Sequence, residues 1–275
     1  MRGQHPFRLL LQQEDGSTRA DSADIVLDCT GTYGQPNPLG DGGIPAPGEE
    51  ALGDRITRTV PDVLAYPESW AGKRLLLVGA GHSAQTAVVD LATLAESHPQ
   101  TEIIWAVRRE RAEWPVIEGD PLPERANLVR RAGAIAAGES SHVRCLTGVV
   151  VDSLEDTDSA LQVTLRRADG SQTDEVVDRI LGLTGFSGDH LLYRQLQVHE
   201  CWATSGPMKL AASLLADSSS DCLDQGGHGP ETLQSPEPDF FILGAKSYGR
   251  NSTFLMRVGW QQVDEVFSLL ARRAP

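Results

Sequence analysis

A short glycine-containing run carries the clearest chemical signal of the sequence. Residues 75–78 are four consecutive aliphatic residues, and the segment from Gly79 to Ala84 reads GAGHSA. In the pattern G-x-G-x-x-A, the first glycine permits a tight turn and the second lets a pyrophosphate approach the backbone, while the alanine keeps the next helix close to the sheet. The chemistry indicated is the binding of a dinucleotide through its phosphates.

The residues on either side of this run predict the elements that must position it. The aliphatic run is typical of a parallel strand that is buried on both faces. After it, apolar residues recur with a helical period until Pro99, at Ala84, Ala87, Val88, Leu91 and Ala95. A glycine turn between a strand and a helix is more specific than the bare pattern, because the helix N-terminus offers free N–H groups to an anion. A glycine-rich turn without a ligand remains the alternative.

The next predicted strand ends in two arginines. Residues 102–107 read EIIWAV and are followed by Arg108 and Arg109. A site that prefers NAD usually has an acidic residue here, on the ribose 2′-hydroxyl, whereas a guanidinium pairs with the 2′-phosphate of NADP. The residue types therefore favour NADP over NAD. Two solvated arginines are the alternative, because exposed arginines are ordinary.

Composition narrows the class of protein. The chain has 275 residues, 40% of them hydrophobic, which suffices for one large or two modest domains. It contains no apolar run of roughly 18 residues and no visible secretory signal, so we expect a cytoplasmic protein without a membrane partner. The net charge of −14 disfavours nucleic acid and anionic surfaces as partners, so the predicted anion site must be local.

Neither the cysteines nor the histidines form a recognisable site. The cysteines are far apart, with no C-x-x-C pair, at Cys29, Cys145, Cys201 and Cys222. The seven histidines show no H-x-H or H-E-x-x-H spacing. The sequence therefore signals no disulfide framework, dithiol redox centre or metal site. No side chain stands out as an acid, base or nucleophile, so we name no catalytic residue.

Two distant segments of the chain resemble each other without gaps. Residues 10–34 and 164–188 align at a constant offset of 154 positions. Each segment predicts a β-hairpin around Asp-Gly and then a strand that ends in Thr-Gly, at Thr30-Gly31 and Thr184-Gly185. A repeat in register indicates a duplicated unit. Only the second copy has a glycine run ahead of it, because the same offset would place a first-copy counterpart before Met1.

The order of these features resembles the flavoprotein oxidoreductases with two dinucleotide-binding domains, particularly their flavin-containing monooxygenase-like branch. A hairpin and Thr-Gly strand are followed by a proline-rich crossover at residues 35–48, the glycine run, and a second hairpin and Thr-Gly strand. In that family an N-terminal unit binds FAD and an inserted unit binds NADPH. The resemblance implies an α/β, Rossmann-like fold in which an NADP-binding domain, residues 59–185, separates two parts of an incomplete FAD-type domain, residues 1–58 and 186–275.

The resemblance also implies roles for individual residues. It makes the glycine run a pyrophosphate site, Arg108 a 2′-phosphate contact, and the two Thr-Gly pairs hinges between the domains. At the C-terminus, a strand at residues 240–243, a loop and a helix from about Thr253 close the flavin site in this family. The residues expected to bind a cofactor are Gly79, Gly81, His82, Ser83, Ala84, Arg108, Arg109, Thr184, Gly185, Lys246 and Arg250.

The C-terminal loop suggests a second anion site. Lys246 and Arg250 place positive charge beside the predicted helix, whose N-terminus Asn251 or Ser252 would cap. We expect these two basic residues to form a cofactor cradle. A solvated basic loop ahead of a packing helix is the alternative.

These features lead us to expect an NADPH-dependent, monooxygenase-like flavoprotein oxidoreductase with a small-molecule substrate. The monooxygenase signature F-x-G-x-x-x-H is absent from residues 56–72. The main alternative is a non-catalytic NADPH-binding or partner-dependent module that has lost FAD. A thioredoxin-reductase-like enzyme would need a C-x-x-C pair, which this sequence does not contain.

The missing first-copy glycine run has two expected consequences. Residues 1–275 alone would not hold FAD tightly, because the pyrophosphate of FAD needs its own strand, turn and helix N-terminus. The first hairpin would also lose the sheet on which it packs. We expect this loss to favour a homo-oligomer by exposing apolar side chains, such as Leu9, Leu11, Ile25 and Leu27.

Overall fold

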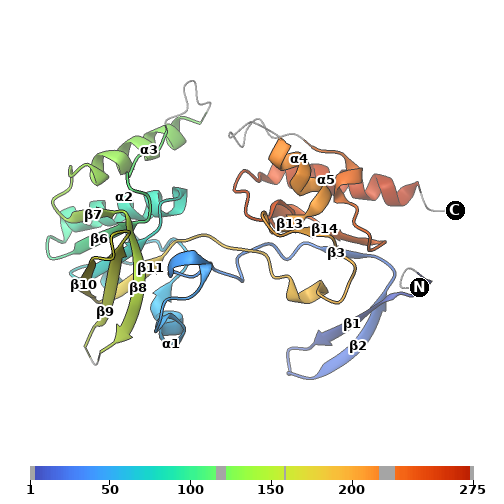
Figure 1. Cartoon of the computed structure of the whole chain (residues 1–275), viewed down its shortest axis with the longest axis horizontal. Coiled ribbons are helices and arrows are strands. Elements are labelled where there is room, and N and C mark those ends of the chain that lie inside the picture. The colour runs from blue at the N-terminus through green and yellow to red at the C-terminus, as the bar shows by residue number, and fades with distance from the viewer. Residues whose placement is uncertain (1–3, 116–121, 158, 217–226, 273–275) are drawn as a thin grey trace. The chain divides into compact units, whose positions relative to one another are not determined.

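The computed structural model of the chain describes residues 4–115, 122–157, 159–216 and 227–272 (Figure 1). The chain divides into two compact units. Unit 1 comprises Met1–Pro36 and Phe186–Pro275, and unit 2 comprises Asn37–Gly185. Within the described residues, no helix is both long and apolar enough to span a bilayer. The predicted α/β class is confirmed, and each unit is described in turn.

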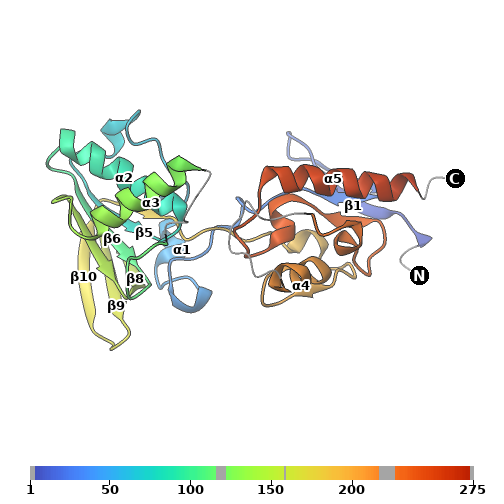
Figure 2. The same ribbon diagram turned by 90° about the horizontal axis from the view of Figure 1, so that it is seen from above.

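Unit 2 is built on a five-stranded, wholly parallel sheet. Its strands lie in the order β4 (Ile56–Thr57), β11 (Arg179–Gly182), β5 (Arg74–Val78), β6 (Glu102–Val107) and β7 (Val143–Thr147). Helix α2 (His82–Ser97) connects β5 to β6, and α3 (Pro123–Ala136) precedes β7. The two helices lie side by side (Figure 2). The predicted strand at 102–107, the glycine turn and the helix that ends before Pro99 are all confirmed.

Both faces of this sheet are covered, as the aliphatic run predicts. Leu75 and Leu77 pack with α2, whereas Leu76 faces an antiparallel sheet on the other side, and all three side chains are fully buried. That second sheet has the order β10 (Gln172–Val177), β9 (Leu161–Arg167) and β8 (Val149–Asp156). Successive residues of a strand point to opposite faces, so a strand buried between two layers must be apolar throughout.

The first boundary of unit 2 differs from the expected one at residue 58. Residues 37–58 belong to unit 2, because β4 pairs with β11 and the short helix α1 (Glu49–Leu52) packs near β8. The buried Glu49 carboxylate accepts hydrogen bonds from the backbone of Leu39 and Ala46 and pairs with Arg58 at 2.7 Å. The proline-rich crossover, which we expected within the first part of the FAD-type domain, is therefore held in unit 2 by a buried ionic network that the local composition does not reveal.

Unit 1 contains a hairpin of β1 (Phe7–Gln12) and β2 (Thr18–Ala23) and a short parallel pair of β3 (Val26–Asp28) and β14 (Phe240–Ile242). Its helices are α4 (Met208–Ala216) and α5 (Met256–Ala271), and β12 (Glu200–Cys201) pairs with β13 (Gly206–Pro207). Short 3-10 turns complete the two units, at Asp41–Gly43, Gly53–Arg55, Pro67–Ser69, Leu191–Tyr193, Pro230–Leu233 and Gly244–Tyr248.

The internal repeat is confirmed in three dimensions. The backbone N–H of Gln13 donates to Ser17 O at 2.8 Å, and Arg167, 154 positions later, donates to Ser171 O at 2.9 Å. Both hairpins turn at a glycine of matching φ, +82° at Gly16 and +83° at Gly170. The strands that follow, β3 and β11, also correspond at this offset.

Two local expectations in unit 1 need correction. Helix α5 begins at Met256, not near Thr253, and no side chain caps it, because the Asn251 carboxamide instead accepts from the N–H and hydroxyl of Thr253. The expected exposure of the first hairpin is only partial. Leu9, Leu11 and Leu27 are half-buried, and Ile25 is 43% exposed.

Candidate dinucleotide-binding site

The glycine run lies where the strand order of unit 2 reverses. From β5 the chain proceeds through β6 to β7 on one side, while β11 returns to pair with β5 on its other side. In open parallel sheets, ligands bind beyond the carboxyl ends of the strands at such a switch point. Gly79 follows the last residue of β5, so the predicted phosphate loop occupies this position.

Gly79 is required by the backbone of the fold. Its φ is +139°, and a Cβ at this residue would lie 2.3 Å from the carbonyl oxygen of Leu183, just after β11. Its own N–H donates to Ala106 O in β6 at 3.2 Å. Any side chain here would push the turn away from the two strands that flank β5.

Gly81 differs, because nothing in the chain itself requires a glycine there. Its φ is −77°, which any residue adopts, and a Cβ would meet no atom within 4 Å. Gly81 is also the N-cap of α2, which receives no side-chain cap and has no acidic residue in its first turn. An open space above an uncapped helix N-terminus fits a bound phosphate.

The first turn of α2 presents its residues as the pattern predicts. His82 and Ser83 are exposed, whereas Ala84 is fully buried against the core. The Ala84 methyl lies 3.4 Å from the position of a Cβ at Gly79, so the helix starts in close contact with the turn. The side-chain oxygen of Gln85, a buried residue in the same turn, has no hydrogen-bond partner among the described residues. These features fit a nucleotide, and they leave the individual contacts of His82 and Ser83 as predictions.

The two arginines follow β6 directly and face solvent. Arg108 and Arg109 are both exposed, and the Arg108 guanidinium has no partner among the residues that the structure describes. The backbone carbonyl of Arg109 accepts from Gly148 N at 2.8 Å, which holds this segment beside the end of β7. Helix α2 has 16 residues, which accounts for the long separation between the glycine run and Arg108. A 2′-phosphate contact remains a prediction that this placement permits.

Thr184 and Gly185 are hydrogen-bonded to Asn37, where the chain enters and leaves unit 2. The Thr184 hydroxyl donates to Asn37 O at 2.6 Å, and Asn37 donates through its N–H to Gly185 O at 2.9 Å. Gly185 has a φ of +88°. This pair lies where the chain leaves unit 2, whereas Thr30-Gly31, its counterpart in the repeat, lies inside unit 1. Only the second Thr-Gly pair is therefore at a boundary between units.

Lys246, which we expected in a cofactor cradle, is buried. Its side chain is 1% exposed, and its Nζ lies 2.6 Å from Asp28 Oδ2 and 3.2 Å from the Thr30 hydroxyl. The ammonium also lies over the Tyr193 ring, 4.8 Å from its centroid. The ammonium is therefore already paired with a buried carboxylate, and this placement does not favour the predicted cofactor contact of Lys246, which stays a prediction. Arg250 is exposed and donates to the Ser205 hydroxyl at 3.1 Å.

Two tryptophans that the sequence analysis did not identify contact the glycine run. Trp105 Nε1 donates to Gly79 O at 2.8 Å, and Trp114 Nε1 donates to Ala80 O at 2.6 Å. Their rings stack, 5.1 Å apart and within 5° of parallel. The only available signal was the tryptophan inside a strand adjacent to the turn and a second one soon after the arginines.

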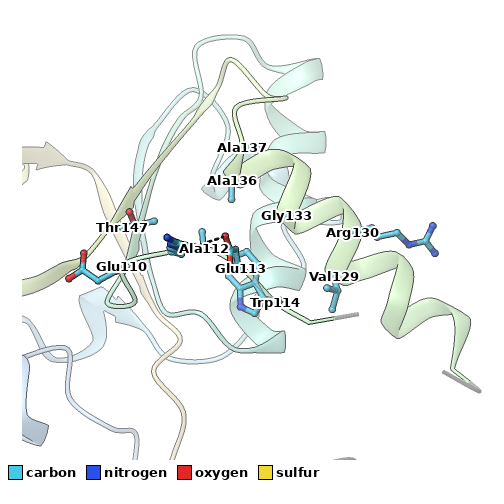
Figure 3. A pocket seen from close by; sticks show the side chains of 11 residues that line it. Glu110, Ala112, Glu113, Trp114, Val129, Arg130, Gly133, Ala136, Ala137 and Thr147 are labelled. Atoms are coloured by element: carbon cyan, nitrogen blue, oxygen red, sulfur yellow. Dashed lines mark ion pairs between the residues drawn. The ribbon is translucent and has the colours of Figure 1, made fainter. Parts of the chain in front are cut away.

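An open hollow of about 510 Å³ lies beside Trp114, between α3 and the segment that follows β6 (Figure 3). Its lining includes Trp114, Val129 and Gly133, with Glu110 and Arg130 among the charged groups. The residues of the glycine run are not among those that line it. The hollow is therefore a neighbour of the predicted phosphate site and not the site itself.

The other titratable groups of the described residues form no recognisable catalytic arrangement in either unit. His190, Tyr193 and Glu200 bond to one another at 2.6–2.9 Å, and burial together with Glu200 raises the pKa of Tyr193. In unit 2, burial raises the pKa of Cys145 to about 11, so this thiol is inert at neutral pH. Within the described residues, no three His, Cys, Asp or Glu side chains are placed to hold a metal ion.

Comparison with known proteins identifies the fold but no close relative. No family model matches the chain, and no curated protein matches its sequence. Among solved structures, bacillithiol disulfide reductase from Bacillus cereus is similar with a TM-score of 0.66 and 18% identity, over 98% of this chain and 68% of that one. Thioredoxin reductase from T. acidophilum gives 0.57 and 12%, over 95% and 73%.

A third similar structure is an ornithine N-hydroxylase from Kutzneria sp. 744, in complex with reduced FAD, NADP+ and L-ornithine. Its TM-score is 0.62 at 12% identity, over 98% of this chain and 68% of that one. Disulfide reductases and N-hydroxylating monooxygenases thus share one architecture with this chain. The chain has the Rossmann-like fold of the FAD/NAD(P)-binding flavoprotein oxidoreductases.

Proposed function

We propose that unit 2 binds NADP at the glycine run and that the chain acts in an NADPH-dependent flavoprotein oxidoreductase. The observation that carries this proposal is Gly81, which the fold itself does not require and which stands open at the uncapped N-terminus of α2. The fold it shares with flavoprotein oxidoreductases supports the same assignment. We also propose that the substrate is a small molecule.

Each part of the site has a proposed task. The N–H groups at Gly81, His82 and Ser83 would hold the pyrophosphate, and Arg108 with Arg109 would pair with the 2′-phosphate. Bound NADPH supplies a hydride for reduction. The arginines and the helix dipole would provide the local positive field that a chain of net charge −14 otherwise lacks.

FAD does not fit the described part of unit 1 in the same way. There, the parallel sheet has only the strands β3 and β14, and no glycine turn joins a strand of that sheet to an α-helix among the described residues, because Gly244 after β14 opens only a short 3-10 turn. The buried pairing of Lys246 with Asp28 removes the charge expected to attract a second anion. We therefore derive no step through a flavin, and we expect the purified 275-residue chain to be colourless.

The type of oxidoreductase is a further proposal. We favour the monooxygenase-like type over a disulfide reductase, because the sequence contains no C-x-x-C pair to exchange with a disulfide. A non-catalytic NADPH-binding module that works with a partner remains the second candidate. The departure of unit 1 from a complete flavin site favours this candidate.

Substitution of Gly81 by valine tests the proposed site. We expect Gly81→Val to remain folded, because a Cβ there meets no atom of the chain, and to lose NADPH binding in a calorimetric titration. Gly34→Val is the matched control, since Gly34 also has open space and no positive φ but lies in unit 1. A folded Gly81→Val protein with wild-type affinity for NADPH would refute the proposal.

A further inference from the structure

The two stacked tryptophans bind the backbone of the glycine turn through their indole N–H groups. Trp105 lies within β6 and is fully buried, whereas Trp114 is half-buried at the side of α3 that carries Val129 and Gly133 (Figure 3). Their indole N–H groups donate to two successive carbonyls, Gly79 O and Ala80 O, at 2.8 and 2.6 Å. Two donors on consecutive peptide units fix the orientation of both units.

This orientation determines where the amides of the turn point. In a planar trans peptide, the C=O of one residue and the N–H of the next point in opposite directions. A carbonyl of Gly79 or Ala80 that is held toward the indole rings therefore directs the N–H of Ala80 or Gly81 away from them. These are the amides at the approach to the open space above α2.

The indole donors supply most of the hydrogen bonding to the two carbonyls of the turn. Within the described residues, the one other hydrogen bond to Ala80 O is a long one, 3.4 Å from the side-chain nitrogen of Gln85. A peptide unit that rotated would present a carbonyl oxygen to the space above α2, where it would repel a phosphate. The tryptophans therefore favour the one orientation of the turn that suits an anion.

Trp114 also connects this turn to the arginine segment. It belongs to the stretch after β6 that begins with Arg108 and Arg109, and the carbonyl of Arg109 is bonded to Gly148 at the other side. The bond from Trp114 to Ala80 thus joins the segment that would bind the 2′-phosphate to the turn that would bind the pyrophosphate. NADP makes both contacts, whereas NAD makes only one.

We propose that Trp114 is a positioning residue that sets the preference of this site for NADP over NAD. The proposal rests on the function proposed above. Trp114 acts through the turn and the arginine segment, and it needs no contact of its own with the nucleotide. Its indole N–H is the essential group, and its ring stack with Trp105 supports that group.

The test compares Trp114→Phe, which keeps an aromatic stack but removes the donor, with Trp70→Phe. Trp70 is buried in the same core and, within the described residues, makes no hydrogen bond to the glycine run, so it controls for the loss of an indole. We expect Trp114→Phe to lower the ratio of NADPH to NADH affinity roughly fivefold, the value of about one hydrogen bond, while Trp70→Phe leaves it unchanged. An unchanged ratio in Trp114→Phe would overturn the proposal.

Hydrogen exchange tests the bond itself without any nucleotide. We expect peptides covering residues 79–84 and 108–115 to exchange faster in Trp114→Phe than in wild type or Trp70→Phe. In the wild type, the Nε1 proton of Trp114 should exchange much more slowly than that of Trp202, whose side chain is 95% exposed. Equal exchange rates for the two indoles would overturn the proposal, even if the variant does not fold.

These readouts also distinguish the two proposals. A wild-type protein that binds neither NADPH nor NADH refutes the proposed function. Slow exchange of the Trp114 indole in that protein would still support its bond to the turn. The proposed preference for NADP would then be refuted together with the proposed function.

Discussion

At the scale of single residues, two features indicate a ligand: a glycine that the fold does not require and an arginine without a partner among the described residues. Gly79 is a glycine because Leu183 O would collide with any side chain, whereas Gly81 has no such reason within the chain. Gly81 therefore says more about a ligand than Gly79 does, because the fold itself does not require a glycine at that position. The same reasoning applies to Arg108, an exposed cation with no partner among the described residues.

Arg108 gives the prediction for this scale. We expect Arg108→Ala to weaken NADPH binding roughly ten- to a hundredfold and to leave NADH binding unchanged, because only the former has a 2′-phosphate for a charge-assisted hydrogen bond. Calorimetric titration with both cofactors measures this. Arg111→Ala is the control, since Arg111 is 80% exposed and its nearest carboxylate, Glu113, is 4.0 Å away. Equal loss for both cofactors would show that Arg108 does not read the phosphate.

The sequence predicted single residues correctly where the local backbone pattern determines their conformation or burial. The turn at Gly79 and the burial of Ala84 follow from local pattern. The buried pairing of Lys246 was not foreseen, because its partner, Asp28, is more than 200 positions away in the chain and no local pattern shows that pairing. Trp114 was not identified for the same reason, since its acceptor is a backbone carbonyl of another element.

At the scale of elements, the chain follows its apolar periodicity closely. The run at 75–78 became β5, the helical period that ends before Pro99 became α2, and the run at 102–107 became β6. The start of α5 was misplaced because Asn251 forms a local turn with Thr253 and does not cap the helix. A side chain with several possible backbone partners leaves such a boundary undetermined in the sequence.

The joint between β10 and β11 gives the prediction for this scale. Asp178 accepts hydrogen bonds from the backbone N–H and the guanidinium of Arg74 at the start of β5, and these bonds lower its pKa. A lowered pKa adds stability above the unfolded-state value of about 3.9, and this stability disappears as the pH falls through the folded-state pKa. The stabilising effect is therefore present at neutral pH and absent in acid.

We expect Asp178→Asn to reduce the free energy of unfolding by about 1 kcal/mol at pH 7, a modest value because Arg74 and Asp178 are 42% and 30% exposed. The difference from wild type should shrink below pH of about 4, as measured by urea unfolding followed through tryptophan fluorescence. Asp24→Asn is the control, because Asp24 is the exposed counterpart of Asp178 in the repeat. A difference that grows in acid would contradict the assignment.

At the scale of the whole molecule, the repeat explains the architecture but not the boundaries. The two hairpins match in register and in φ, as expected for a duplicated unit. The division falls at Pro36 and not at the expected residue 58, because the resemblance assigned residues 1–58 to one domain and the local composition of residues 37–58 does not show which unit holds them. The buried Glu49 network and the pairing of β4 with β11 assign this stretch to unit 2.

The central claim is that residues 37–185 contain a complete NADP site, and calorimetric titration of that fragment with NADPH and NADH tests it most directly. We expect the fragment to fold, to bind one NADPH, and to prefer it over NADH as the full chain does. A fragment of residues 59–185, which lacks β4 and the Glu49–Arg58 pair, should be markedly less stable. A folded 37–185 fragment that takes up no NADPH would contradict the account.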